Sequence, residues 1–156
     1  MRTRDSGGPP PRDVDTLDSI LGAFYDVISG PAGRRRDWAR DRALYLPGAV
    51  QVATGVRDGK PFALAMDHDA YASRADALFR HEGFFEREIH RVVRRFGNIA
   101  HVFSTYESRR DEEGPVFARG VNSIDLYFDG ARWWIASAVW DSERPDNPIP
   151  PEWLPA

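Results

Sequence analysis

Two acidic residues and a histidine alternate along one stretch of the chain, where they could transfer protons. Glu86, Glu88 and His90 fall at every second position between Phe84 and Phe96, so in an extended strand they share one face. An imidazole titrates near neutrality, and a carboxylate two positions along the same face can orient it. Glu88 and His90 are therefore the candidate acid–base pair. The competing interpretation is an exposed edge strand whose mixed charges prevent edge-to-edge aggregation.

The turn at Gly97-Asn98 decides which residues face this pair, and the sequence allows two registers. A two-residue turn pairs Glu88 with Glu107, whereas a three-residue loop pairs it with Tyr106. The two-residue turn pairs His90 with Thr105, and the three-residue loop pairs it with Ser104. Both registers stay open at this stage.

A second group of candidate residues comes from the stretch between Arg119 and Glu143, which is typical of two long strands around an FDGA turn. Apolar residues occupy every second position there, the period of half-buried strands. A three-residue loop closed by a bulge sets Asn122 opposite Ala136. Asn122 is then one polar side chain on an apolar face that also carries Trp140. A two-residue Asp-Gly turn would shift the pairing and mix the two faces.

The face of Asn122 predicts a pocket if the neighbouring strand continues it. Tyr106, Asn122 and Trp140 then converge, and an apolar wall with few polar groups is what a small-molecule site needs. Asn122 is expected to present its amide to a ligand oxygen. Tyr25 and Trp38, on preceding helices, are expected to close the base, although aromatic stripes on helices more often only bury area. In the competing interpretation, Asn122 satisfies buried backbone groups and Trp140 is packing.

The opposite face of the same hairpin is too apolar to be left in water. It carries Val121, Trp133, Ile135 and Val139. Exposed patches of this kind usually mark an interface. We therefore expect a homodimer that forms through this outer face of the sheet.

The rest of the chain supplies the elements that must hold these residues. Helical spacing predicts helices over Val14–Ser29, Arg34–Tyr45 and Asp67–Glu82. The predicted strands are Ala49–Gly55, Lys60–Met66, Phe84–Phe96, Ile99–Arg110 and the two strands of the hairpin Val116–Asp141. Helices gathered on one face of an antiparallel sheet define the α+β class. We expect a cone-shaped, strongly curved antiparallel sheet that wraps three N-terminal helices.

Composition sets the domain organisation and excludes several functions. The sequence predicts one domain over residues 13–143, between a disordered tail at 1–12 and a proline-rich tail at 144–156. A net charge of −3 argues against a general nucleic-acid binder, and no apolar run could span a membrane. Without a signal peptide, a soluble cytoplasmic protein is expected.

No metal or cofactor is expected either. The chain lacks cysteine, and its four histidines show no metal-ligand spacing. A glycine-rich phosphate loop and a GxSxG nucleophile elbow are also missing from the sequence.

The segments GNIAHVFSTYESR and FARGVNSIDLYFDGARWWIASAVWDSE resemble the SnoaL-like, nuclear transport factor 2-like superfamily. The most recognisable feature is a Gly-x-x-Trp turn that leads into a strand ending in Trp-Asp, and the resemblance covers about Asp13 to Glu143. It implies a cystatin-like α+β cone with a pocket at its open end. Members include ketosteroid isomerase-like enzymes, polyketide cyclases, dehydratases, epoxide hydrolases and non-catalytic binding modules, so the fold does not give the function.

One comparison with ketosteroid isomerase-like members can be made residue by residue. Those enzymes place a general-base aspartate at the end of the first strand, where this chain has Val50-Gln51-Val52-Ala53. Their oxyanion-hole aspartate lies near Asn122 to Ile124, and their pocket tryptophan resembles Trp140. The resemblance thus implies a site of similar shape that lacks the general-base aspartate. This counts against the isomerisation that ketosteroid isomerase-like enzymes carry out.

The sequence therefore predicts a small-molecule-binding protein, with a cofactor-free lyase, isomerase or cyclase acting on an apolar or aromatic carbonyl compound as the leading hypothesis. His90 or Glu88 would transfer the proton, and Tyr106 and Asn122 would polarise an oxygen. The alternative is a non-catalytic ligand carrier or a dimeric protein-interaction module. A titratable group with a perturbed pKa that faces an open cavity would favour the enzyme.

Overall fold

The computed structural model describes residues 11–156. Of the tail expected at 1–12, residues 1–10 lie outside the described range, and residues 11 and 12 belong to a helix. Within the described range, no helix has the length and apolar character needed to cross a membrane.

The described residues form four α-helices. They are α1 (Pro11–Val14), α2 (Leu17–Asp26), α3 (Trp38–Arg42) and α4 (His68–Phe79). The helix predicted over Val14–Ser29 is divided at Thr16, because Thr16 Oγ1 accepts a hydrogen bond from the Ser19 amide while Ser19 Oγ accepts one from the Thr16 amide, both at 3.0 Å. This capping box begins α2. The second predicted helix is shorter than expected because Tyr45 starts a strand.

Six strands build a single sheet in the order β2-β1-β6-β5-β4-β3. Their bounds are β1 (Tyr45–Arg57), β2 (Lys60–Met66), β3 (Phe85–Phe96), β4 (Ile99–Arg109), β5 (Val116–Phe128) and β6 (Trp133–Ser142). Neighbours pair antiparallel except β1 and β6, which run parallel. That parallel pair joins the early hairpin to the long strands and was not predicted.

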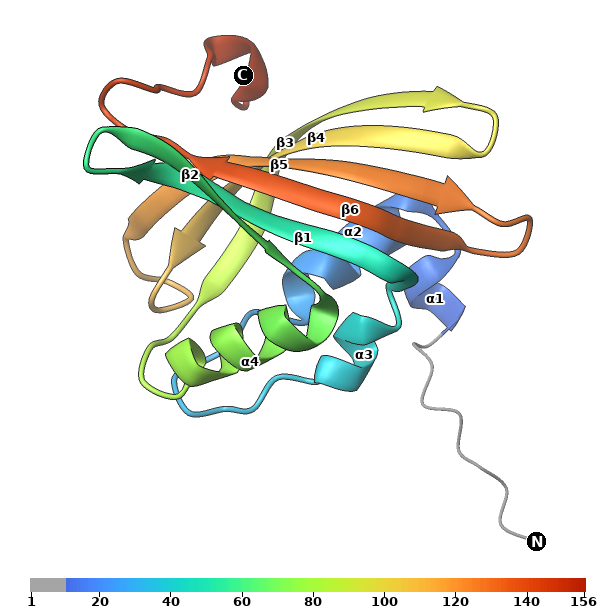
Figure 1. Ribbon diagram of the computed structural model, residues 1–156, viewed down its shortest axis with the longest axis horizontal. Helices are drawn as coiled ribbons and strands as arrows, with labels where there is room; N and C mark the ends of the chain where they lie inside the picture. The colour runs from blue at the N-terminus through green and yellow to red at the C-terminus, as the bar shows by residue number, and fades with distance from the viewer. Residues whose placement is uncertain (1–10) are drawn as a thin grey trace, which may run out of the picture.

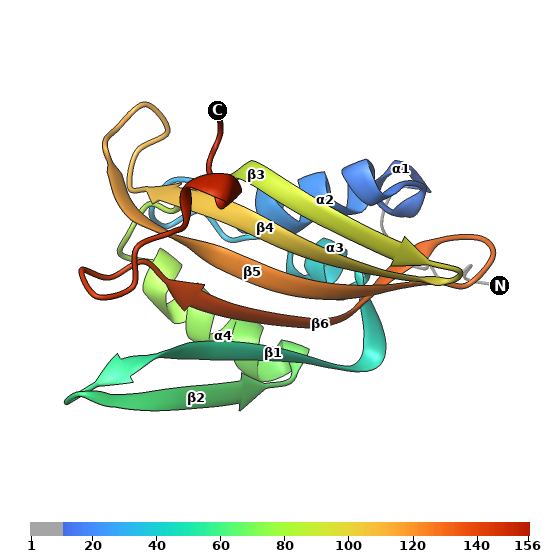
Figure 2. The same cartoon turned by 90° about the horizontal axis from the view of Figure 1, so that it is seen from above.

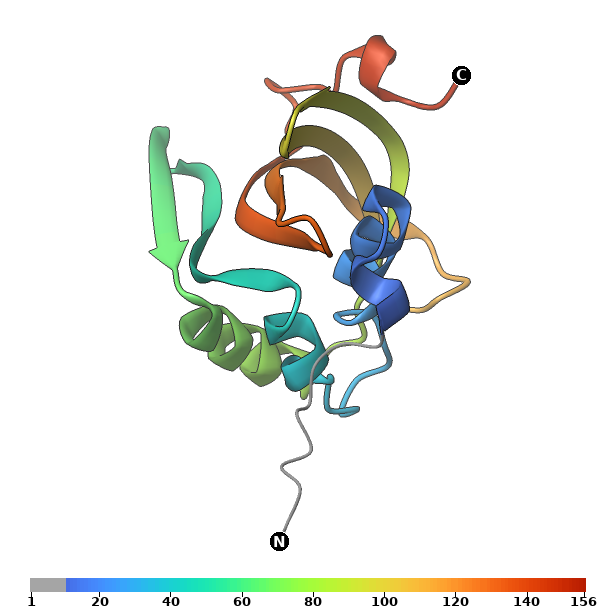
Figure 3. The same ribbon diagram turned by 90° about the vertical axis from the view of Figure 1, so that its right-hand side faces the viewer.

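The sheet is strongly curved, as the sequence predicted, and it is not closed. Figure 3 shows the strands curling around the helices, with β2 splayed away at one edge. Figure 2 shows the same strands from above, with β3 at the opposite edge. The helices lie on the concave side, and the C-terminal segment crosses the convex side (Figure 1). This is the expected α+β architecture.

The core lies between the concave face and α2. Its fully buried side chains include Ile20, Leu21, Leu44, Val102, Ile124, Leu126 and Ile135. Trp133 belongs to the same core and is 3% exposed, while Ile135 is 0% exposed. The prediction that Trp133 and Ile135 form an outer dimer face is therefore wrong, because both side chains point inward under the helices.

A bulge in the last hairpin explains this error. The observed pairs are Asn122 with Trp140 and Phe128 with Trp133, so the predicted pairing of Asn122 with Ala136 is also wrong. The loop has four residues, because Asp129 Oδ1 accepts hydrogen bonds from two backbone amides ahead of it, each at 2.8 Å. The register then shifts between Asp125 and Leu126. One extra residue in β6 reverses the alternation of side chains between the two faces. Trp133 and Ile135, at the start of this strand, therefore face the core.

The C-terminal segment packs on the convex face. Ile149 is buried there, and the ring of Trp153 lies edge-on against Phe103 with ring centroids 4.9 Å apart. Thr105 Oγ1 donates a hydrogen bond to the Trp153 carbonyl at 2.7 Å. The segment therefore covers the convex side of β3, β4 and β5, whereas β1 and β6 keep exposed valines.

Candidate functional site

An inner cavity of about 330 Å³ opens between α2, α4 and the concave face of the sheet. The three residues predicted to converge, Tyr106, Asn122 and Trp140, all line it. Aromatic side chains supply much of the remaining wall: Phe24, Tyr71, Phe79, Phe84 and Phe117. The size and the apolar character suit a small organic molecule. The sheet thus brings together three residues that lie far apart in the sequence.

Glu86, the second residue of β3, projects into this cavity. Ser108 on the neighbouring strand donates a hydrogen bond to Glu86 Oε2 at 3.0 Å. The backbone of Glu86 is anchored as well, because its amide donates to Ser29 Oγ at 3.0 Å, just beyond α2. Burial among aromatic rings disfavours the charged carboxylate and raises the pKa of Glu86 from 4.5 to about 7. Glu86 is thus a carboxyl group that can gain or lose a proton at neutral pH.

Two phenols in the cavity wall stay protonated at neutral pH. Burial raises the pKa of Tyr106 to about 12, and it raises that of Tyr71 well above its usual value. Tyr106 lies across from Gly120 on β5, where any Cβ would overlap the phenol oxygen. Glycine at this position leaves room for the ring to reach the cavity. Tyr106 Oη contacts Ser142 Oγ at 3.4 Å, where either hydroxyl group can be the donor, so a ligand oxygen would compete with Ser142 for the Tyr106 proton.

Tyr25 and Trp38, predicted to close the base of the pocket, lie behind its wall. Tyr25 Oη accepts a hydrogen bond from Asn122 Nδ2 at 3.0 Å, so it supports the cavity through Asn122. Trp38 stacks on Phe79, with centroids 6.3 Å apart, and meets Tyr71 edge-on at 6.2 Å. Neither residue contributes directly to the lining. Their role is to hold the side chains that do.

Glu88 and His90 do not form the predicted pair. The register of β3 shifts between them, so both candidate registers occur: His90 pairs with Thr105 near the turn, and Glu88 pairs with Tyr106 beyond the bulge. Glu88 consequently faces the concave side, where Ser104 hydrogen-bonds to its Oε2. His90 faces the convex side with Thr105. The bulge at Ile89 separates them across the sheet, which rules out direct proton exchange between their side chains.

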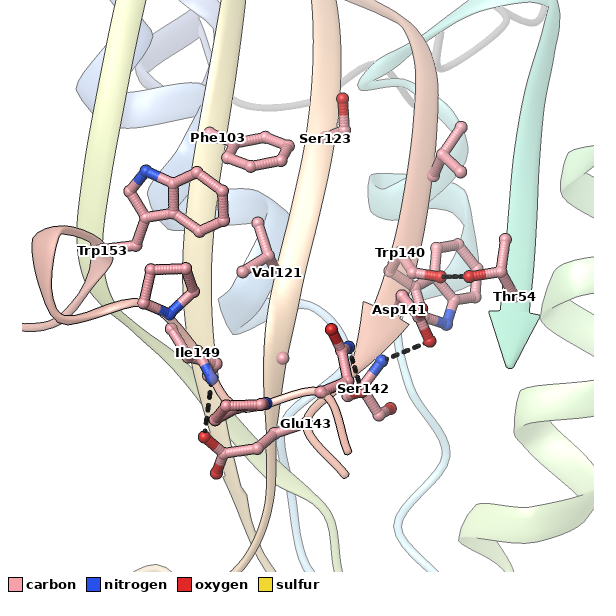
Figure 4. Close-up of a pocket in the computed structure, with 15 residues that line it drawn as sticks. Thr54, Phe103, Val121, Ser123, Trp140, Asp141, Ser142, Glu143, Ile149 and Trp153 are labelled. Carbon is pink, nitrogen blue, oxygen red and sulfur yellow. Dashed lines mark hydrogen bonds between the residues drawn. The ribbon is translucent and has the colours of Figure 1, made fainter. Parts of the chain in front are cut away.

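A second hollow of about 300 Å³ lies on the convex face, beneath the C-terminal segment (Figure 4). Its acidic groups already have partners. The amide of Ile149 donates to Glu143 Oε2 at 3.1 Å and lowers the pKa of Glu143, while the Arg144 guanidinium lowers that of Asp141. Trp153 covers one side next to Phe103. These contacts attach the C-terminal segment to the sheet, so we place the candidate site in the inner cavity.

The sequence contained the signal for Glu86 but did not distinguish it from its neighbours. Glu86 and Glu88 share one face by period-two spacing, and both proved to face inward. Only Glu86 reaches the cavity, since Arg91 and Ser104 engage both oxygens of Glu88. The length of β3 and its bulge decide this, and neither could be read from residue types.

One other buried polar pair lies near the cavity. Asp41 Oδ2 and His68 Nε2 are 2.7 Å apart, behind Tyr45, and burial raises the pKa of Asp41. Neither side chain lines the cavity. Among residues 11–156, no group of three or more histidine or acidic side chains is arranged to hold a metal ion.

Comparison with known proteins identifies the fold. No protein-family model matches the sequence, and no curated protein matches it. Solved structures do match. A cystatin-like-fold protein of unknown function from Nostoc punctiforme aligns with a TM-score of 0.62 at 7% identity, over 83% of this chain and 90% of that one.

Two further solved structures are similar to this chain. The β subunit of a candidate aromatic-ring-hydroxylating dioxygenase from Novosphingobium aromaticivorans gives a TM-score of 0.60 at 17% identity, covering 82% of this chain and 88% of that one. A candidate dehydratase of the nuclear transport factor 2-like family from Streptomyces avermitilis gives 0.53 at 18%, covering 78% and 90%. These likenesses show the fold.

Proposed function

We propose that this chain, which has the nuclear transport factor 2-like fold, binds a small apolar molecule in its inner cavity and transfers a proton to or from it through Glu86. The observation that carries the proposal is a carboxyl group buried inside an aromatic cavity, where burial raises its pKa to about 7. A general acid or base works best when its pKa lies near the working pH. Glu86 thereby takes the role that the sequence had suggested for Glu88 and His90.

The surrounding side chains support cofactor-free lyase, isomerase or cyclase chemistry. Ser108 holds one oxygen of Glu86 and leaves the other free to meet a substrate proton. The phenols of Tyr71 and Tyr106 can donate hydrogen bonds to an oxygen that gains negative charge. The aromatic wall lowers the local dielectric constant, which strengthens these interactions.

The candidate carrier function differs from this proposal in one respect. A carrier needs apolar burial and no titrating group, and a buried carboxyl group weakens the binding of an apolar ligand because its ionised form must be desolvated. Glu86 therefore favours catalysis over transport.

The proposal extends to a homodimer that uses the remaining exposed part of the convex face. Val139 is 37% exposed and Val50 is 38% exposed, on neighbouring parallel strands. Val121 lies on the same face, one strand further, where it lines the hollow beneath the C-terminal segment. Exposed apolar residues on adjacent strands are typical of an interface. Trp133 and Ile135 have no part in it.

The direct test begins with the molecule that the purified protein retains. Organic extraction and mass spectrometry identify it, and incubation with fresh protein in deuterated water follows. Wild-type protein is expected to convert the molecule or exchange one of its protons, while Glu86→Gln is expected to do neither. Glu107→Gln is the matched control, because Glu107 is bound by Arg87 and Arg109 away from the cavity. A molecule that is retained but returned unchanged and unexchanged by wild type would establish the carrier instead.

A further inference from the structure

Behind the cavity wall, a series of hydrogen bonds connects Asn122 to Glu88, and each of them has its donor on the Asn122 side. Arg91 Nε donates to Glu88 Oε1 at 2.6 Å, which pairs this side chain with a guanidinium, and Ser104 donates its proton to Glu88 Oε2. A hydroxyl group has one proton, so at the 2.6 Å contact between Tyr25 Oη and Ser104 Oγ the donor must be Tyr25. Tyr25 Oη then has only lone pairs left, which accept from Asn122 Nδ2 at 3.0 Å.

This chain of bonds fixes the orientation of the Asn122 amide. A flipped amide would set Asn122 Oδ1 against Tyr25 Oη with no proton between the two oxygens. Asn122 is 4% exposed and lines the cavity, so with Nδ2 directed at Tyr25 its carbonyl oxygen lies on the cavity side. Among the described residues, no hydrogen bond occupies Oδ1. Asn122 therefore presents a hydrogen-bond acceptor to the cavity. This is contrary to the expectation that Asn122 donates to a ligand oxygen.

A second amide presents the same polarity. Gln51 on β1 is 2% exposed and lines the cavity, and its Nε2 donates to Tyr45 Oη at 3.0 Å. Gln51 Oε1 is buried and has no hydrogen-bond partner within the described chain. A buried acceptor without a partner is unfavourable, and Gln51 Oε1 is enclosed by protein, so Asn122 Oδ1 remains the amide oxygen that a ligand can reach.

We propose that the cavity selects a hydroxyl compound: a small, largely apolar molecule whose O–H group donates to Asn122 Oδ1. This inference rests on the proposed ligand site and adds the substrate class. Glu88, Ser104 and Tyr25 act as positioning residues, since they reach the ligand only through Asn122. An ammonium group is disfavoured because the lining is mostly apolar and Arg74 places a positive charge at the same cavity.

Isothermal titration calorimetry at pH 7 with two probes tests this selection. 2-Naphthol has a hydroxyl donor, and 2-methoxynaphthalene has the same ring system without one. Wild-type protein is expected to bind 2-naphthol about 10-fold more tightly, the value of one hydrogen bond to a buried acceptor. Ala53→Trp, which fills part of the cavity wall, is expected to abolish the binding of both probes.

The positioning residues give the sharper test. Tyr25→Phe removes the oxygen that holds Asn122 Nδ2, so the amide can turn and the preference for 2-naphthol is expected to fall to about 3-fold or less. Ser104→Ala is expected to act in the same direction and serves if Tyr25→Phe does not fold. Affinity for 2-methoxynaphthalene should not change in either variant, whereas general damage would weaken both probes alike. Ser137→Ala on the convex face is the matched control.

The outcomes separate this inference from the proposed function. If wild type binds both probes equally and Ala53→Trp abolishes binding, the cavity is a ligand site and the hydroxyl selection is overturned. If neither probe binds, or if binding survives in Ala53→Trp, the cavity itself is wrong and both proposals fail. A preference that persists unchanged in Tyr25→Phe and Ser104→Ala would overturn the role of the chain behind Asn122.

Discussion

At the scale of single residues, the site depends on one carboxyl group whose surroundings oppose its charge. Within residues 11–156, the carboxyl group of Glu86 has a serine as its hydrogen-bond donor and no arginine partner, whereas Glu88, two positions along, is held by Arg91. The same residue type on the same face therefore has two roles. One carboxylate supports the wall, and the other titrates in the cavity.

The raised pKa of Glu86 predicts how stability changes with pH. Because the folded protein binds this proton more tightly than the unfolded chain, the destabilisation grows as the pH rises from about 4.5 to about 7 and is complete above that. Glu86→Gln removes the charge and keeps an acceptor for Ser108. We expect it to raise the free energy of unfolding by about 2 kcal/mol at pH 8 and to leave it unchanged at pH 4.5.

Urea unfolding at the two pH values measures this difference. Glu107→Gln, which loses two ion pairs instead, is expected to show no gain at pH 8. A Glu86→Gln variant that is less stable than wild type at pH 8 would show that the carboxylate is held by favourable partners.

At the scale of elements, two bulges decide which side chains reach the cavity. The shift in β6 turns Trp133 and Ile135 inward, and the shift in β3 sends His90 to the convex face. Strand periods and element order were predictable from sequence, because alternation and turn residues are local signals. The bulges were not, since an extra residue in a strand leaves no signature in residue types. The faces were therefore assigned correctly only for residues on one side of each bulge, such as Asn122 and Trp140.

The C-terminal segment offers a prediction of its own. Trp153→Ala removes the edge-on contact with Phe103 and uncovers the convex face, so we expect a loss of about 1–2 kcal/mol in unfolding free energy. Probe binding in the inner cavity should not change, because the sheet separates the two sites. Thermal melts and calorimetry measure both quantities, with the exposed neighbour Glu152→Ala as control. Lost probe binding in Trp153→Ala would mean that the two faces are coupled.

At the scale of the whole molecule, the open sheet leaves apolar side chains accessible in the inner cavity and at the valines of β1 and β6. The homodimer expected from sequence is retained as a proposal on a smaller surface. Val139→Asp places a charge in the middle of that surface and is expected to give a monomer at micromolar concentration. Light scattering coupled to gel filtration measures the mass. The same substitution at exposed Val93 on β3 is the control. A wild-type monomer would contradict the proposed interface.

The titration of Glu86 itself is the decisive measurement. Protein labelled with ¹³C at the glutamate side-chain carboxyl carbon is followed by NMR across the pH range, and the Glu86→Gln variant assigns the resonance. We expect a midpoint near pH 7 for Glu86, inside an aromatic cavity that must both bind a ligand and exchange a proton with it. A midpoint near the ordinary value of 4.5 would contradict it, because Glu86 would then be a permanent anion at neutral pH.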